Sequence, residues 1–332
     1  QRCLDVQHMA VDPKTEDVYV TDVFKNAFRI RDWREPRFER CMSGEKTPLR
    51  ALSLAIDVRN RLLYAHNYMR GKVKHSLYRY RLDRKYIEPA PIGGAATHAI
   101  SGKHRVGNYW NIGFGQPNRG IAVSPDGGVA ALGSTEHTDY SGPLHYFARN
   151  DQAVPWKPMW FECLGRKPAT AGIRFDPAGN LYVGVFGRGK CGRIVTFAPT
   201  GKLADGNLYP KPPAKPSRVY DVDYGFPGGG SPPLPPRFGV DGYGRICYPT
   251  SLEPRVTLID NEGNEILRFG TYGNRDSMGG LEGDPVPTRD VPMAWPSSVD
   301  ATDDYVYVSD IVNARVLRLA KTFAAAESCP IR

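Results

Sequence analysis

The sequence predicts an all-β protein assembled from repeated units, and three observations predict it. First, residues 294–323 read as strand, turn, strand, turn, strand, with alternating apolar residues in the strands. Second, residues 8–33 repeat this pattern almost position by position. Third, weaker copies begin between them, at Ile56, Val123, Phe175 and Val240. A unit of about thirty residues is too small to bury a face of its own, so it must pack against further copies.

The first strands of the six copies set the number and size of the units. Their apolar core positions are residues 11, 56, 123, 175, 240 and 299, which lie between 45 and 67 residues apart. Four-stranded propeller blades with insertions in their loops have this spacing. The sequence therefore predicts one domain, a six-bladed β-propeller of four-stranded antiparallel blades. The expected blades cover residues 1–47, 48–95, 96–166, 167–215, 216–272 and 273–332.

The repeated residues resemble the NHL repeat, in which an Asp follows the first strand and Asp, Asn and Arg follow the second. The best matches are the first copy, with Asp12, Val18–Asp22 and Asn26, and the last, with Asp300, Tyr305–Asp310, Asn313 and Arg315. The resemblance implies a six-bladed propeller. It implies no single function, because NHL proteins include binding modules, scaffolds and a few enzymes such as the peptidyl-hydroxyglycine amidating lyase, and related six-bladed folds include gluconolactonase-like hydrolases.

Charge and hydropathy narrow the class of partner. The 332-residue chain has a formal net charge of +9, which favours anionic partners. Its basic residues are spread along the chain without a dense run, and this argues against nucleic acid. No apolar run reaches the length of a transmembrane segment.

The number and spacing of the cysteines indicate the cellular compartment of the protein. Six are present, at positions 3, 41, 163, 191, 247 and 329, and none has a metal-binding or haem-attachment spacing. An even count of this kind favours disulfides and an exported protein, periplasmic or extracellular. A bridge between Cys3 and Cys329 would lock the ring closed. The alternative is that the cysteines are reduced and packed as small hydrophobic residues. Because the first copy begins almost at residue 1 with no signal-like segment before it, we expect a processed protein or one domain of a longer chain.

Candidate ligand-binding residues lie where the first strands begin, which is one face of a propeller. His8 and Arg237 occupy equivalent start positions in the first and fifth copies. Arg119 and Trp295 stand just before the equivalent positions of the third and sixth. Around a ring of six, His8, Arg119 and Arg237 form a basic triangle, and arginine can hold a carboxylate or phosphate through paired hydrogen bonds. The sequence predicts an anion site at this mouth, with the alternative that the arginines pair with structural aspartates.

The same mouth carries three histidines, His8, His66 and His137, from three copies. Together they form a candidate site for a divalent metal, zinc or calcium, since neutral imidazoles suit zinc. The amidating lyase, which has this type of repeat, uses three histidines and an arginine in such a mouth, although its local motifs are absent here. The alternative is that His8 packs in the channel and the other two are solvated. Asp22 and Asp310, which follow second strands, are predicted to shape turns.

These observations predict an exported binding or scaffold module. Its ligand would be a protein, an anionic carbohydrate or a small molecule, held at the channel mouth and the face with the long loops. Tyr109, Trp110 and Tyr140 offer a stacking surface for a sugar. The alternative is a metal-dependent lyase or hydrolase acting in the mouth. The sequence has no nucleophile elbow, zinc-protease motif or phosphate loop, which favours the binding function.

Overall fold

The computed structural model describes most of the chain in β-strands and turns. None of the described residues lies in a helix, which confirms the all-β prediction for this part of the chain. Accordingly, the described part offers no helix with the length and apolar character needed to cross a membrane. The described residues are 6–22, 24, 26–42, 48–68, 75–82, 88–90, 97–99, 108–111, 120–132, 144–149, 169–187, 190–202, 206, 208–209, 215–224, 236–250, 253–274 and 290–322.

Antiparallel sheets follow one another along the chain, and six of those described contain three or more strands. The first sheet consists of β1 (Val6–Val11), β2 (Val18–Asp22), β3 (Ala27–Arg31) and β4 (Arg37–Arg40). The second has the order β5 (Ser53–Asp57), β6 (Leu62–Tyr68), β7 (His75–Arg81), β10 (Asn108–Asn111) and β9 (Thr97–Ala99), with β8 (Glu88–Pro89) beside β7. The third consists of β11 (Ile121–Val123), β12 (Val129–Leu132) and β13 (Leu144–Phe147).

The second half of the chain repeats this plan. The fourth sheet consists of β14 (Ala169–Phe175), β15 (Leu181–Gly187), β16 (Lys190–Phe197) and β19 (Arg218–Val222). The fifth consists of β20 (Gly239–Val240), β21 (Ile246–Thr250), β22 (Arg255–Ile259) and β23 (Glu265–Phe269), and the sixth of β26 (Pro296–Ala301), β27 (Tyr305–Asp310) and β28 (Arg315–Ala320). Two small pairs complete the set, β17 (Gly201–Lys202) with β18 (Leu208–Tyr209), and β24 (Thr271–Tyr272) parallel to β25 (Pro292–Met293).

Sheet membership extends beyond the limits expected from the repeats. Strands β9 and β10 lie within the expected 96–166 unit but join the second sheet, and β19 lies within the expected 216–272 unit but joins the fourth. Outer strands carry little of the repeated pattern, so the sequence gives weak guidance to the sheet they join.

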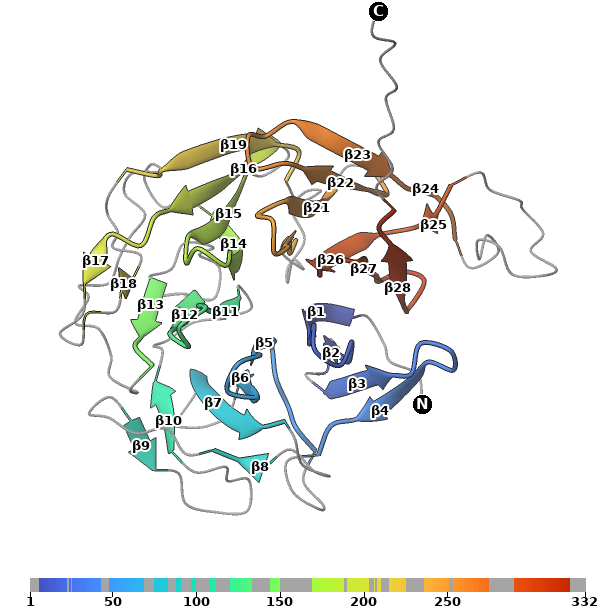
Figure 1. The fold of residues 1–332 in the computed structure, drawn as a ribbon. Helices are drawn as coiled ribbons and strands as arrows, with labels where there is room; N and C mark the ends of the chain where they lie inside the picture. The colour runs from blue at the N-terminus through green and yellow to red at the C-terminus, as the bar shows by residue number, and fades with distance from the viewer. Residues whose placement is uncertain are drawn as a thin grey trace, which may run out of the picture.

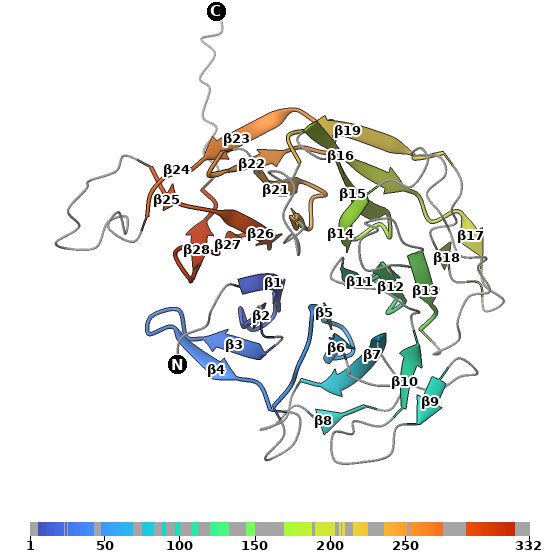
Figure 2. The same ribbon diagram turned by 180° about the vertical axis from the view of Figure 1, so that it is seen from behind.

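The sheets are arranged around a common centre, with the first strand of each nearest to it (Figures 1 and 2). Neighbouring sheets touch at these strands: β1 contacts β5, β5 contacts β11, β11 contacts β14, β14 contacts β20, β20 contacts β26, and β26 contacts β1. The last sheet therefore packs against the first.

The hydrophobic core is divided among the spaces between successive sheets. One cluster joins the first and second sheets through Tyr19, Leu54 and Tyr78, and corresponding clusters join each later pair. The cluster between the sixth and first sheets joins Tyr307 to the β1 residues Val6 and Met9. Each sheet thus buries its two faces against its two neighbours, as expected of units that cannot bury a face alone.

Short polar side chains hold the turns as predicted. The Asp22 carboxylate accepts a hydrogen bond from Asn26 N at 2.7 Å. Asp310 accepts hydrogen bonds from Trp295 N at 2.9 Å and from Arg315 Nε at 3.2 Å. Both residues therefore have the structural role that their spacing predicted.

Two of the six cysteines are free buried thiols, Cys41 and Cys247. Burial raises the pKa of each to about 12, so both behave as small hydrophobic residues. Cys3, Cys163 and Cys329 lie outside the described residues, so the bridge between Cys3 and Cys329 stays a prediction.

Candidate functional site: a basic cluster at the centre of the sheets

The first strands place equivalent residues at matching heights around the centre, and strand register defines two levels. In the middle level, Ala10 pairs with Tyr19 and Ala55 with Tyr64, and Arg174 and Asp300 hold the same place beside Tyr182 and Tyr307. The middle level is Ala10, Ala55, Ala122, Arg174, Gly239 and Asp300. The start level lies two residues earlier in the chain, in the first strand or just before it, and consists of His8, Ser53, Gly120, Gly172, Arg237 and Ser298.

His8, in the start level, is fully buried. Its Nδ1 accepts a hydrogen bond from Leu54 N in the neighbouring sheet at 3.1 Å, which places the proton of the neutral ring on Nε2. Burial, reinforced by the positive charges of Arg237 and Arg174, holds the pKa of His8 well below its usual value. His8 is therefore a neutral ring whose Nε2–H is a donor, and in the described part of the chain this atom has no hydrogen-bond partner.

Arg237 is 1% exposed and is the largest fully buried side chain of the described residues. Its backbone is fixed between the fifth and sixth sheets. Arg237 N donates to Ser297 O at 2.9 Å, Val299 N donates to Arg237 O at 2.9 Å, and the segment forms a parallel bridge with Ser298. The charge of Arg237 acts on both His8 and Tyr224, so its guanidinium lies in the same central cluster.

Arg174 connects three sheets through one carboxylate. Its Nε lies 3.4 Å from Asp300 Oδ1 across the centre, while Asp300 Oδ2 accepts a hydrogen bond from Val11 N at 3.1 Å. Arg174 Nη1 donates to Ile173 O at 2.9 Å, and Nη2 is buried without a partner among the described residues. One carboxylate thus faces a region that holds two guanidinium groups.

Tyr224 forms one wall of this region. Its hydroxyl lies 2.8 Å from Ala171 O and 2.5 Å from Pro236 O. Burial raises its pKa, against the lowering effect of Arg237 and Arg174, so it stays a phenol. Two glycines pack against Tyr224 too closely to carry a side chain. A Cβ on Gly184 would lie 2.4 Å from the Tyr224 ring, and a Cβ on Gly192 would lie 1.5 Å from Tyr224 O.

A cavity of about 420 Å³ opens at the downstream ends of the first strands. All six of these strands and their following turns contribute to its lining, which includes Arg174 and Asp300. This is the face opposite the predicted mouth, because the start level lies at the other end of the strands. Arg174 belongs to the cavity wall and also acts electrostatically on His8, so it links the open cavity to the buried cluster.

The structure brings together two of the four predicted ligand-binding residues, His8 and Arg237. Trp295 is half-buried and holds Asp310 through its backbone. Arg119 lies outside the described residues. In the predicted metal set, His66 is buried and pairs across strands with Ser53, and His137 lies outside the described residues. Among the side chains that the structure describes, no three metal-binding groups come together.

Sequence reasoning missed Arg174, although a signal for it exists. At the middle level, only the fourth copy carries an arginine. The other five copies carry a small residue or an aspartate there. The middle-level residues of the other copies are Ala10, Ala55, Ala122, Gly239 and Asp300. A single basic residue at a position that is otherwise small or acidic, at the centre of a repeat array, indicates a role outside packing.

Comparison with solved structures identifies the architecture. The β-propeller domain of Myceliophteria thermophila Cps50 (Swd1) superposes with a TM-score of 0.54 over 97% of this chain and 98% of that one, at 11% identity. This chain has a β-propeller fold. Hydrazine synthase of Kuenenia stuttgartiensis (TM-score 0.49, 14% identity, 97% of each chain) and a nidogen/laminin complex (TM-score 0.47, 15% identity, 89% of this chain and 86% of that one) are also similar. No protein-family model and no curated protein sequence matches the propeller.

Proposed function

We propose that the chain is a six-bladed propeller that acts as a binding module and takes a small anion at its centre. One observation carries the proposal: buried polar groups without partners gather around two arginines. In the described part of the chain, these groups are His8 Nε2, Ser53 Oγ, Ser298 Oγ and Arg174 Nη2. Each can donate a hydrogen bond, and buried donors need acceptors.

Charge favours an anion over a neutral acceptor. Arg174 and Arg237 both act on His8, and Asp300 is paired with Arg174. Arg174 keeps Nη2 buried without a hydrogen-bond partner among the described residues, although its Nε is paired with Asp300, and a guanidinium donor held away from water favours a charged acceptor. A carboxylate, a phosphate or an acidic sugar supplies both the charge and the acceptor atoms.

Six blades and ring closure belong to this proposal. Six apolar clusters between successive sheets, including the one between the last and the first, support them. The NHL-like character rests on the repeat residues alone, and export rests on the cysteine count alone.

The geometry favours binding over metal chemistry at His8. Coordination through Nε2 requires its lone pair, but the hydrogen bond from Leu54 N to Nδ1 leaves the proton on Nε2. The same donor is suited to an anionic oxygen.

The test is calorimetric titration with acetate, inorganic phosphate and glucuronate, at low ionic strength and again at about 0.15 M salt. We expect at least one of them to bind the wild-type protein, and Arg237→Met to weaken that binding by about tenfold or more, since charged hydrogen bonds contribute about 1.5–3 kcal/mol. The control is Arg193→Gln, which removes an exposed arginine of β16 paired with Asp221 at 2.9 Å and should leave binding unchanged.

His8→Gln provides a second variant in case Arg237→Met folds poorly. It removes the ring but keeps an amide donor, and we expect an intermediate loss of affinity. The proposal is overturned if none of the three anions binds, or if well-folded Arg237→Met and His8→Gln bind as tightly as the wild type.

A further inference from the structure

A second cavity, of about 490 Å³, lies between the fourth and fifth sheets, away from the central cluster. Its wall is formed by the turns after β14 and β20, the outer strand β19 and the turn after β22. Three tyrosines contribute to the wall: Tyr182, Tyr220 and Tyr243. We call this cavity the tyrosine groove.

Tyr243 is 69% exposed, the most exposed large aromatic or aliphatic side chain among the described residues. A tyrosine ring held out on a rigid support offers a large contact area at a low cost in conformational entropy, as the aromatic anchors of binding surfaces do.

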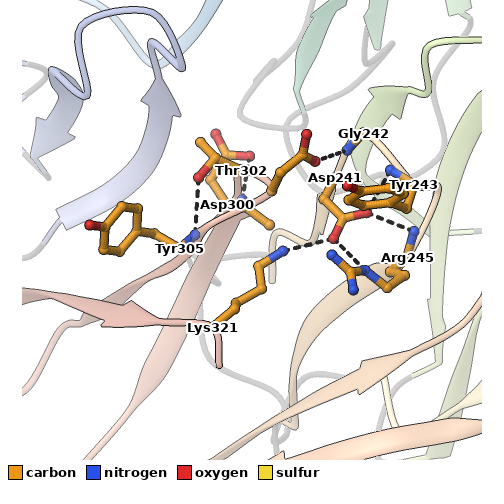
Figure 3. Close-up of polar contacts among 10 residues, drawn as sticks. Asp241, Gly242, Tyr243, Arg245, Asp300, Thr302, Tyr305 and Lys321 are labelled. Carbon is orange, nitrogen blue, oxygen red and sulfur yellow. Dashed lines mark hydrogen bonds and ion pairs between the residues drawn. The ribbon is translucent and has the colours of Figure 1, made fainter. Parts of the chain in front are cut away.

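The turn that carries Tyr243 is strongly restrained (Figure 3). The buried carboxylate of Asp241 accepts hydrogen bonds from Tyr243 N and Arg245 N at 3.0 Å each, and from Arg245 Nε and Lys321 Nζ at 2.7 Å each. Gly242 N donates to Asp303 Oδ1 at 2.8 Å. The turn is thus held to its own strand and to the sixth sheet, which fixes the ring before any ligand arrives and lowers the entropy cost of binding.

One face of the Tyr243 ring is covered, because the Arg245 guanidinium lies 4.7 Å from the ring centre. The other walls of the tyrosine groove are polar and held in place. Tyr182 Oη donates to Asp176 at 3.2 Å, and Tyr220 Oη donates to Asn261 O at 2.9 Å. Asn180 Nδ2 also donates to Asp176, at 2.7 Å, which leaves the Asn180 amide oxygen as an acceptor.

We propose that the tyrosine groove binds an oligosaccharide of pyranose sugars. A pyranose ring has an apolar C–H face and a rim of hydroxyls. The C–H face matches the open part of the Tyr243 ring, and the hydroxyls match the amide of Asn180 and the phenolic oxygens of Tyr182 and Tyr220. This site is independent of the central anion site.

The chemistry of the walls favours a sugar over the other partners that stack on tyrosine. Among the described residues that line it there is no Leu, Ile, Val, Met or Phe side chain, so this part of the wall lacks the aliphatic pockets that hold a peptide's apolar residues. Its arginine, Arg218, is paired with Glu262 at 3.1 Å, which leaves little positive charge for the phosphates of a nucleic acid.

The experiment uses the full chain and four neutral hexasaccharides: cellohexaose, xylohexaose, mannohexaose and chitohexaose. Saturation-transfer NMR finds which of them contact the protein, and calorimetry measures the affinity. We expect at least one to bind and Tyr243→Ala to weaken it about tenfold or more, because truncating an aromatic anchor costs more than about 1 kcal/mol. Tyr243→Phe should keep most of the affinity, since it keeps the ring.

The matched control is Tyr272→Ala, which removes a tyrosine of equal exposure, 68%, on β24 outside the tyrosine groove. It should leave binding unchanged, as should Arg237→Met if the two sites are independent. The proposal is overturned if none of the four sugars binds, if Tyr272→Ala weakens binding as much as Tyr243→Ala, or if a decaproline peptide or oligo-dT binds the groove through Tyr243 while no sugar does.

Discussion

Arg174 Nε and Asp300 Oδ1 lie 3.4 Å apart, although the two residues come from the fourth and sixth sheets, which are not neighbours. The fifth sheet places Gly239 at the intervening position, and a Cβ there would lie 2.8 Å from Asp300 Cα. The ion pair therefore passes the fifth sheet, whose middle-level residue is a glycine and leaves room for it. An anion bound at the proposed central site would share Arg174 with Asp300.

The first prediction concerns this competition. Asp300→Asn removes the competing charge while keeping an oxygen for Val11 N, so we expect tighter binding of phosphate or glucuronate in calorimetry. Arg174→Met should weaken binding. The same Asp300→Asn change should lower the free energy of unfolding by about 1–3 kcal/mol in denaturant titrations, because it leaves a largely buried guanidinium without its carboxylate. Weaker anion binding in Asp300→Asn would contradict the competition.

The second prediction concerns pH and His8. Its pKa is lowered in the folded protein, so between that lowered value and the ordinary value the unfolded chain binds a proton that the folded chain does not. The contribution of His8 to the free energy of unfolding is therefore fully present above about pH 6.5, and it is lost as the pH is lowered toward 5. In urea titrations across this range, His8→Gln should show a shallower loss of stability than the wild type. The other histidines are common to both proteins, so equal slopes would show that His8 does not titrate in this way.

The third prediction concerns the glycines beneath Tyr224. In Gly192→Ala the new methyl would lie 1.5 Å from the Tyr224 backbone oxygen, and relieving this clash requires a shift of the backbone, which costs more energy than a side-chain rotation. We expect a loss of several kcal/mol, or failure to fold, in thermal and denaturant unfolding. Gly206→Ala is the comparison: it has a φ of +86° but nothing within 4 Å, so only the backbone cost of about 1–2 kcal/mol applies. A Gly192→Ala protein as stable as Gly206→Ala would contradict the packing.

The fourth prediction concerns the free thiols. Burial raises the pKa of Cys41 and Cys247 to about 12, so neither forms the reactive thiolate at pH 8. Iodoacetamide labelling followed by peptide mass analysis should leave both unmodified in the native protein and modify both in guanidinium. Rapid labelling of either one in the native state would show that its sheet opens locally.

The sequence was most informative where the repeat is strongest. The all-β composition and the turn roles of Asp22 and Asp310 both follow from residues whose spacing recurs. The sixth copy shows one limit of this reasoning. Its register pairs Ala301 with Val306, whereas the first copy pairs Val11 with Val18, so the sixth turn is shorter. Ser298, rather than Pro296, therefore holds the place equivalent to His8.

The rest depended on contacts between distant residues. Nothing local to Arg174 indicates that it reaches Asp300, and nothing local to β10 indicates that it pairs with β7. The tyrosine groove was equally hidden, because Tyr243 and Asn180 belong to different copies and meet only when two sheets pack side by side.

The junction between the sixth and first sheets has a consequence for how the protein is made. Its contacts join residues far apart in the chain: Val11 N donates to Asp300 and Ser309 Oγ donates to Val6 O, across 289 and 303 residues. On a ribosome adding about 5–20 residues per second, strand β1 must wait on the order of tens of seconds for its partner. During that interval the apolar side chains of Val6 and Met9 lack the partners they have in the sixth sheet, which makes the nascent chain a client for chaperones and prone to misassembly. Synthesis, rather than the finished protein, is the stage at which this architecture is most exposed to aggregation.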